Sequence, residues 1–172
     1  GQMTKREVRA MTLAALAPTP GARLWDVGSG CGSVAIEWMR AADRACAIAI
    51  ERNAERRAMT AHNALALGTP NLKVIAGSAP AALDGLEAPD AVFVGGGVAG
   101  EGVVETCWNA LPSGGRLVAN AVTLESEQAL YRHHETLGGE LVRVAVSRAE
   151  PVGGLTGWRP MMPVTQWRAV KP

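Results

Sequence analysis

Short apolar runs alternate along the chain with longer segments whose apolar positions recur at helical spacing. Such runs are typical of strands buried in a parallel sheet, and the longer segments are typical of connecting helices. The pattern predicts strands at 23–27, 45–50, 72–76, 91–94, 116–121, 140–147 and 164–170. It predicts helices at 4–17, 33–42, 54–67, 101–111 and 124–137, and a short helix opening near Pro80. Repeated units of this kind indicate an α/β domain that binds its ligand at the carboxyl ends of the strands.

The first predicted strand runs directly into a glycine-rich loop, residues 25–32, with the sequence WDVGSGCG. Glycine allows the backbone to turn sharply and to approach a ligand closely, because a Cβ atom would clash there. The predicted helix that follows points free backbone N–H groups at the same place. The loop therefore predicts a site for a nucleotide cofactor, with a glycine-rich turn that binds nothing as the alternative.

The glycine spacing separates two families of nucleotide-binding loop. The dinucleotide fingerprint would place its third small residue at position 33, where this chain has Ser33, whereas the third glycine is Gly32. A G-x-G-x-G loop resembles the first motif of class I methyltransferases that use S-adenosylmethionine. The second predicted strand is followed by Glu51, whose carboxylate can accept hydrogen bonds from both hydroxyls of an unphosphorylated ribose.

Composition narrows the protein class. The length of 172 residues fits one domain, residues 1–172, and no apolar run reaches the ~18 residues of a membrane span. The net charge of +1 gives no case for a nucleic-acid partner. The three cysteines lack metal-ligand spacing, so we expect no metal site and no disulfide framework, and a reducing cytoplasm fits best.

The two ends of the chain add further expectations. Residues 4–7, with the sequence TKRE, form a capping box in which the Thr4 oxygen accepts from the N–H group of Glu7. Residues 151–163 are rich in proline and glycine, which predicts a mobile cover without regular structure. Basic residues near both ends can flank an anionic small molecule, although solvated surface charge is the alternative explanation for most of them.

Several segments together resemble the decarboxylating precorrin methyltransferases of cobalamin (vitamin B12) synthesis, and the resemblance covers nearly the whole chain. They are TKREVR at 4–9, WDVGSG at 25–30, SVAIEW at 33–38, AIERN at 49–53, GSAP at 77–80, FVGGG at 93–97 and MMPV at 161–164. The resemblance implies a Rossmann-like class I methyltransferase fold with a seven-stranded, mostly parallel sheet and a terminal antiparallel hairpin. It also implies methylation of carbon 15 of a tetrapyrrole and loss of carbon dioxide from the acetate on carbon 12.

The family also suggests how the chain is organised. This domain occurs either as a free protein or as the carboxyl half of an enzyme whose other half methylates carbon 5. The chain begins Gly1-Gln2, so we expect an excised carboxyl-terminal domain, with a tag remnant ahead of Met3 as the alternative. Some relatives are tetramers, so we expect an oligomer of identical chains.

Site residues follow from the resemblance, residue by residue. The loop residues Gly28, Ser29, Gly30, Cys31 and Gly32 would wrap the methionine part of S-adenosylmethionine, and S-adenosylhomocysteine would be the product. The other expected cofactor residues are Asp26, which would order the loop and reach the amino group through water, Glu51 for the ribose, Ser78 and Ala79 for the adenine, and Thr4, whose alternative role is a helix cap. The expected substrate contacts are Lys5, Arg9, Asn120, Trp158 and Arg159. The family supplies no acid-base residue that can be transferred.

Two other function classes share the cofactor half. A methyltransferase acting on RNA, protein or another small molecule would differ on the substrate side. The chain has no basic stripe and no Asn-Pro-Pro-Tyr type motif after the fourth predicted strand, which counts against a base-modifying enzyme. A non-catalytic cofactor-binding module would lack an open cavity beside the methyl group.

Overall fold

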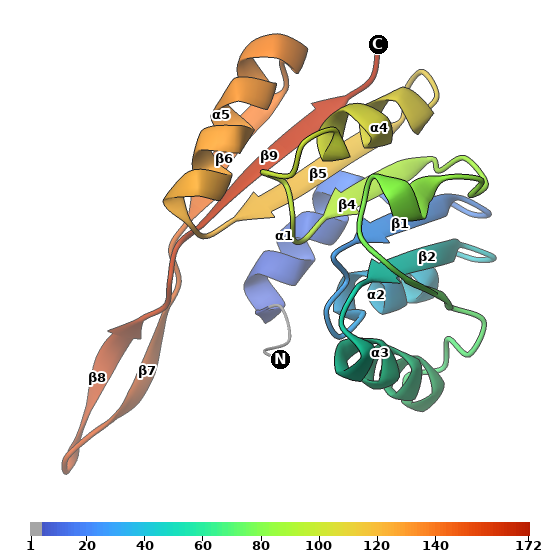
Figure 1. Ribbon diagram of the computed structural model, residues 1–172. Helices are drawn as coiled ribbons and strands as arrows, with labels where there is room; N and C mark the ends of the chain where they lie inside the picture. The colour runs from blue at the N-terminus through green and yellow to red at the C-terminus, as the bar shows by residue number, and fades with distance from the viewer. Residues whose placement is uncertain (1–4) are drawn as a thin grey trace.

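The computed structural model describes residues 5–172 and consists of one seven-stranded sheet between two layers of helices, with a separate two-stranded hairpin (Figure 1). The strands are β1 (Arg23–Val27), β2 (Cys46–Glu51), β3 (Lys73–Ala76), β4 (Ala91–Val94), β5 (Arg116–Ala121), β6 (Glu140–Val144), β7 (Ser147–Val152), β8 (Leu155–Pro160) and β9 (Val164–Val170). The helices are α1 (Arg6–Leu16), α2 (Ser33–Ala41), α3 (Ala54–Ala66), the 3-10 helix η1 (Ala81–Leu83), α4 (Val103–Ala110) and α5 (Leu124–Leu137).

The strand order of the large sheet is β3-β2-β1-β4-β5-β9-β6. All neighbours from β3 to β5 are parallel, and β9 runs antiparallel to both β5 and β6. The predicted mostly parallel sheet with a terminal antiparallel pair is therefore confirmed. The chain reverses its direction of travel across the sheet between β1 and β4, and ligands of such sheets bind outside the strand ends at that switch point.

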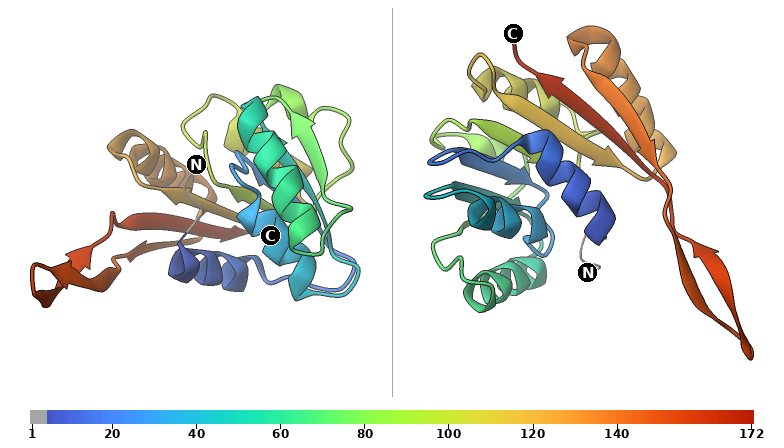
Figure 2. Two further views of the ribbon diagram at one scale, coloured as in Figure 1. Left: turned by 90° about the horizontal axis from the view of Figure 1, so that it is seen from below. Right: turned by 180° about the vertical axis from the view of Figure 1, so that it is seen from behind.

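Each face of the sheet buries its own set of side chains. Leu24 and Val118 face the layer of α1, α2 and α3, which contributes Leu16, Ile36 and Trp38 to the core. The opposite face packs against α4 and α5, and α1 and α5 lie on opposite sides of the sheet in Figure 2. A sheet buried on both faces explains why its strands read as nearly continuous apolar runs.

Most predicted elements are confirmed to within a few residues at each end, and several strands and α5 agree with the prediction at both ends. The predicted start of the first helix differs: α1 begins at Arg6, with Lys5 at the capping position and no side-chain capping bond. Thr4 lies outside the described residues. No helix within residues 5–172 combines the length and the apolar character needed to cross a bilayer.

The prediction of an irregular cover at residues 151–163 is wrong. Strands β7 and β8 pair in antiparallel register and form a hairpin that extends away from the body of the molecule (Figure 1). Gly153 and Gly154 lie between the two strands, and Gly153 has the left-handed φ of +59° that tight turns need. Prolines are tolerated because each strand of a two-stranded ribbon has an unpaired edge. The proline and glycine content that suggested a loop belongs to a hairpin.

Candidate functional site

The loop between β1 and α2 has a left-handed backbone at three glycines, with φ of +70° at Gly28, +61° at Gly30 and +77° at Gly32. A Cβ atom on Gly28 would lie 2.8 Å from the carbonyl oxygen of Gly96, in the loop that follows β4. A Cβ atom on Gly32 would lie 2.6 Å from Cγ2 of Thr60, whereas one on Gly30 would meet nothing within 4 Å. Two of these glycines are therefore required by the packing of the protein itself, and the third leaves open space.

Side chains from β2 and α3 hold this loop through its backbone. Thr60 Oγ1 donates to the carbonyl of Gly30 at 3.0 Å, and Asn63 Nδ2 donates to the carbonyl of Cys31 at 3.0 Å. Neither residue was predicted from the sequence. Their spacing of three places them on one face of the helix, which is the signal that could have found them.

Glu51 is the last residue of β2 and is buried. Its Oε2 accepts from the N–H group of Gly30 at 3.0 Å, and its Oε1 accepts from the N–H group of Asn53 at 2.9 Å. A carboxylate has about four lone-pair positions, so each oxygen can accept a further bond. Glu51 thus fixes the glycine loop and keeps acceptor capacity for a ligand.

Asp26 lies one residue before the end of β1 and is 1% exposed. Its Oδ2 accepts from the N–H group of Ala35 in α2 at 3.1 Å. Its Oδ1 and the hydroxyl of Ser29 are buried and have no hydrogen-bond partner among residues 5–172. Burial raises the pKa of Asp26 to about 7, and the nearby charge of Glu51 contributes to the rise. Buried acceptors without partners suit a ligand that brings N–H donors.

Two cavities adjoin the glycine loop. The Glu51 cavity has a volume of about 380 Å³ and is lined in part by Glu51, Ser78 and Ala79. The Asn120 cavity has a volume of about 410 Å³ and is lined in part by Lys5, Asn120 and the loop itself. Both cavities share Gly28, Gly95 and Arg56, so they meet at the switch point between β1 and β4. A ligand that passes Gly28 can occupy both.

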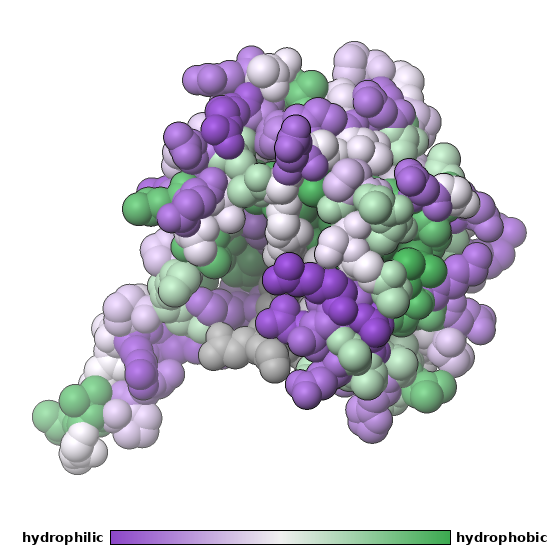
Figure 3. Space-filling view, in the orientation of Figure 1, coloured by the Kyte–Doolittle hydropathy of each residue, from purple (hydrophilic) through white to green (hydrophobic). Residues whose placement is uncertain are grey.

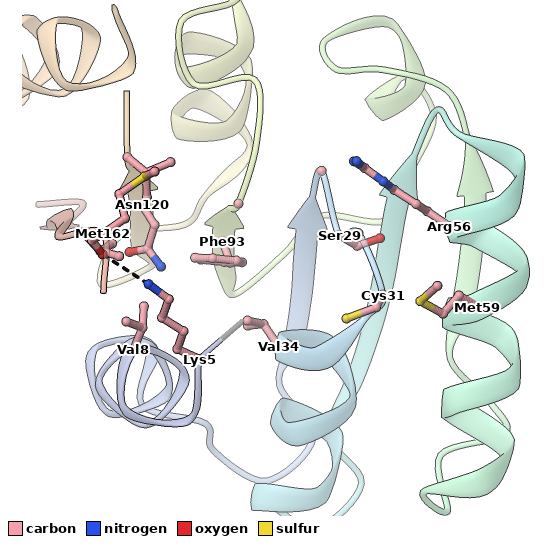
Figure 4. Close-up of a pocket in the computed structure, with 15 residues that line it drawn as sticks. Lys5, Val8, Ser29, Cys31, Val34, Arg56, Met59, Phe93, Asn120 and Met162 are labelled. Atoms are coloured by element: carbon pink, nitrogen blue, oxygen red, sulfur yellow. Dashed lines mark hydrogen bonds between the residues drawn. The ribbon is translucent and has the colours of Figure 1, made fainter. Parts of the chain in front are cut away.

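The Asn120 cavity has an apolar lining with a cation at each of two opposite ends. Lys5 projects from the start of α1 and Arg56 from α3, on the far side of the glycine loop (Figure 4). The apolar lining residues are Val8, Val34, Met59, Phe93, Val122, Met162 and Val164. Lys5 Nζ donates to the carbonyl of Met162 at 3.3 Å, which joins the beginning of the described chain to the segment before β9.

The structure brings together most of the predicted site residues. The Asn120 cavity collects Lys5, Gly28, Ser29, Gly30, Cys31 and Asn120, and the Glu51 cavity collects Gly28, Glu51, Ser78 and Ala79. Gly32 precedes α2 at the capping position, and Asp26 lies beneath the loop. Arg56 was not predicted from the sequence, although the first turn of the helix after β2 must lie near the strand's carboxyl end.

Three predicted substrate residues do not line these cavities. Arg9 forms an ion pair with Glu37 of α2. Trp158 and Arg159 lie on β8, where Trp158 is 77% exposed and Arg159 Nη1 pairs with Oε2 of Glu150 at 3.1 Å. Their expected role depended on a loop folded over the ligand, and the hairpin instead carries them away from it.

Comparison with known proteins identifies relatives over the full length of the chain. Residues 1–171 match the family model described as a precorrin methyltransferase domain. A Sinorhizobium protein named precorrin-6Y C(5,15)-methyltransferase [decarboxylating] is 57% identical over 99% of this chain. The chain spans 41% of the length of that relative.

Solved structures give the same result for the fold. The C-terminal domain of precorrin-6Y C5,15-methyltransferase from Rhodobacter capsulatus is 45% identical, with a TM-score of 0.92 over 99% of this chain and 92% of that chain. A SAM-dependent O-methyltransferase from Thermotoga maritima is 18% identical, with a TM-score of 0.77 over 100% of this chain and 68% of that chain. The fold is therefore that of the class I methyltransferases, as the resemblance implied.

Proposed function

Because the chain belongs to the precorrin methyltransferase family, we propose that it transfers a methyl group from S-adenosylmethionine to carbon 15 of a precorrin and removes carbon dioxide from the acetate on carbon 12. The observation that carries this proposal is the meeting of the two cavities at Gly28 and Gly95. A cofactor bound by its nucleoside in the Glu51 cavity would present its methyl group to the Asn120 cavity. The reaction would be a step of cobalamin synthesis.

The residues around the Glu51 cavity fit S-adenosylmethionine. Glu51 has acceptor capacity for the ribose hydroxyls, and Ser78 and Ala79 line the wall expected to face the adenine. The methionine part would follow the open side of the glycine loop at Gly30. Asp26 Oδ1 and the Ser29 hydroxyl are buried acceptors without partners in the described chain, which suits an ammonium group or a water bound to it. A contact from Thr4 stays a prediction.

The chemistry requires little acid-base assistance from side chains. S-adenosylmethionine supplies a methyl group on a sulfonium leaving group, and a precorrin carbon is electron-rich. The chain contributes alignment, which can supply several kcal/mol through proximity. Decarboxylation leaves electrons that the conjugated macrocycle absorbs, and the apolar lining of the Asn120 cavity excludes water from the departing carboxylate. Lys5 and Arg56 would pair with the carboxylates that remain.

The size of the Asn120 cavity limits how the substrate enters. A volume of about 410 Å³ suits a drug-sized ligand, whereas a precorrin is considerably larger. We infer that only the ring edge carrying carbon 15 and the acetate on carbon 12 enters the cavity. The remaining propionate and acetate groups would lie outside, near the cations at the rim.

We propose that the chain is the carboxyl-terminal domain of a longer enzyme that also methylates carbon 5, because it spans less than half of a relative named for both positions.

We also propose an oligomer of identical chains, with a tetramer as one option, built through the β7–β8 hairpin. Val152 and Leu155 near the hairpin tip are 65% and 81% exposed, and Figure 3 shows apolar residues gathered there. Light scattering measures the molar mass in solution: we expect the mass of an oligomer for the unaltered chain and a smaller mass for Leu155→Glu. Cytoplasmic location and the lack of a nucleic-acid partner stay predictions from composition.

The proposed activity is tested by incubating the chain with S-adenosylmethionine and candidate precorrins, with mass spectrometry of the products. We expect a methyl gain and a carbon dioxide loss on one precorrin, and a lower yield of both with Glu51→Ala at a cofactor concentration that just saturates the unaltered chain. Cofactor binding without a change in any precorrin would instead favour a binding module or another methyl acceptor.

A further inference from the structure

Three polar side chains from distant parts of the chain meet behind the Asn120 cavity. Thr12 comes from α1, Asn120 from β5 and Gln166 from β9, and Asn120 and Gln166 are direct partners in the β5–β9 ladder. Thr12 is 0% exposed and Gln166 is 1% exposed. Buried polar groups of this kind destabilise the fold unless their hydrogen bonds are satisfied. The donor or acceptor role of each atom can therefore be assigned from its partners.

The orientation of the Gln166 amide is fixed from outside the group. Arg168 Nε donates to Gln166 Oε1 at 2.7 Å, and an arginine can only donate. The oxygen of Gln166 therefore faces Arg168, and its nitrogen faces inward. There Nε2 donates to Asn120 Oδ1 at 2.8 Å and to Thr12 Oγ1 at 3.0 Å.

Thr12 completes the assignment. Its single hydroxyl proton goes to the carbonyl of Val8 at 2.8 Å, so Oγ1 can only accept from the other two side chains. It accepts from Asn120 Nδ2 at 3.2 Å. Every member of the group thus has a determined donor or acceptor role, and the amide of Asn120 has one orientation that satisfies both neighbours.

One N–H group of Asn120 remains after these bonds. Nδ2 carries two protons, and Thr12 takes one of them; the other has no acceptor among residues 5–172. Figure 4 shows the Asn120 side chain among the lining residues, extending toward Lys5 and Phe93. The cavity therefore offers a neutral N–H donor beside the ammonium group of Lys5, a pair that suits an acceptor-only anion such as a carboxylate.

We propose that Gln166 and Thr12 are positioning residues that hold an N–H group of Asn120 toward the cavity, where it donates to a side-chain carboxylate of the tetrapyrrole. The substrate part of this inference rests on the proposed function. The orientation part does not. A flipped amide would present an oxygen to the same carboxylate, which turns an attractive contact into a repulsive one.

The decisive variant is Gln166→Glu. A carboxylate at this position still accepts from Arg168 but cannot donate to Asn120 Oδ1 or to Thr12 Oγ1. The amide of Asn120 therefore turns its nitrogen toward residue 166 and its oxygen toward Thr12 and the cavity, and the Thr12 hydroxyl turns from Val8 to donate to that oxygen. We expect the KM for the precorrin to rise by about 10-fold or more, as for loss of a hydrogen bond to a charged group. The affinity for S-adenosylhomocysteine should change by less than about twofold, since the expected ribose and adenine contacts lie in the Glu51 cavity.

Two further variants keep the test decisive if Gln166→Glu folds poorly. Asn120→Asp removes the donor directly and should raise the KM at least as much as Gln166→Glu. Thr165→Val is the matched control: its neighbour Gln166 faces α1, whereas Thr165 bonds to Glu127 of α5. We expect Thr165→Val to retain the KM of the unaltered chain. An unchanged KM in Asn120→Asp would overturn the proposal, and so would a rise in KM matched by an equal loss of cofactor affinity in both Gln166→Glu and Asn120→Asp.

Nuclear magnetic resonance tests the orientation without any precorrin. The side-chain amide signals of Asn120 are assigned by their loss in Asn120→Asp. We expect a nuclear Overhauser contact from one amide proton to the methyl group of Thr12, and its weakening in Gln166→Glu. Amide protons that contact no atom of Thr12 in the unaltered chain would refute the orientation. An unaltered chain that leaves every precorrin unchanged would refute the proposed function and the carboxylate ligand, while the orientation is still decided by the spectra.

Discussion

The two cavities are built in different ways, although they share Gly28 and Gly95. Beside the Glu51 cavity, the glycine loop is held by contacts within one strand–helix–strand–helix stretch, such as Thr60 to Gly30, 30 residues apart in sequence. The Asn120 cavity depends on contacts between the two ends of the chain. Gln166 and Thr12 are 154 residues apart, and Lys5 and Met162 are 157 apart.

This difference assigns distinct physical roles to the two sides. Around the Glu51 cavity, most of the holding bonds involve backbone groups of the glycine loop, so the geometry follows from the chain path. Around the Asn120 cavity, the holding bonds join side chains of α1, β5 and β9. We therefore expect changes around the Glu51 cavity to affect folding and cofactor binding together. Changes around the Asn120 cavity should affect substrate binding selectively.

The largest effect is expected at the point where the two cavities meet. Gly28→Ala places a Cβ atom against the backbone of Gly96 at a left-handed φ. We expect the free energy of unfolding to fall by about 2–5 kcal/mol, from backbone strain and overpacking together. Gly30→Ala is the matched control, with a left-handed φ but open space, and should lose about 1–2 kcal/mol. Urea unfolding followed by tryptophan fluorescence measures both; equal losses would contradict the close approach of the two loops.

The second expectation concerns pH and the buried carboxyl beneath the loop. The pKa of Asp26 is raised to about 7 in the folded chain, against about 3.9 in the unfolded chain. Between these values the folded chain holds a proton that the unfolded chain has released. The contribution of Asp26 to stability therefore falls as pH rises from about 4 to 7, by up to about 4 kcal/mol.

Asp26→Asn should remove this part of the pH dependence. Unfolding curves measured at several pH values should show a stability gap between the variant and the unaltered chain that changes steadily from pH 4 to 7 and levels off above it. Asp43→Asn, at a side chain that is 85% exposed, is the control and should keep the pH dependence of stability of the unaltered chain. Parallel profiles for Asp26→Asn and the unaltered chain would show that Asp26 is ionised throughout.

The third expectation concerns cofactor binding at Glu51. Glu51→Ala should weaken S-adenosylhomocysteine binding by about 1.5–3 kcal/mol, as for loss of charge-assisted hydrogen bonds. Glu51→Gln keeps the shape and one acceptor, so it should lose less. Glu55→Ala, in the first turn of α3, is the control. Calorimetry showing unchanged affinity for Glu51→Ala, or tight NAD binding to the unaltered chain, would refute the assignment.

The sequence predicted where the residues around the Glu51 cavity lie in the fold, because their signals are local. Buried parallel strands appear as apolar runs, and the glycine spacing and Glu51 follow from consecutive elements whose order is nearly fixed in such folds. Thr60 and Asn63 were missed because their spacing places them on one face of α3 but does not show which loop that face contacts.

The Asn120 cavity was harder to predict because the residues that build it are distant in sequence. Nothing near Gln166 in the sequence indicates Thr12 as its neighbour, and nothing near Lys5 indicates Met162.

The hairpin was missed for another reason. Proline and glycine are shared by irregular loops and by two-stranded ribbons, and only the register of Ser147–Val152 against Leu155–Pro160 distinguishes them.

The smallest expected effect tests which basic residues serve the substrate. Lys5 lines the Asn120 cavity, whereas Arg159 pairs with Glu150 on the exposed hairpin. Lys5→Met keeps the length of the side chain and removes one cation from the rim. The KM for the precorrin should then rise by roughly 2- to 10-fold, the value of a partly solvated charge pair. Arg159→Met removes a charge of the same sign and should change the KM by less than about twofold, because its ion pair is exposed and lies on the hairpin. Steady-state kinetics on both variants at saturating S-adenosylmethionine decide the matter. A larger loss in Arg159→Met than in Lys5→Met would mean that the hairpin reaches a substrate site, either on its own chain in another conformation or on a neighbouring copy.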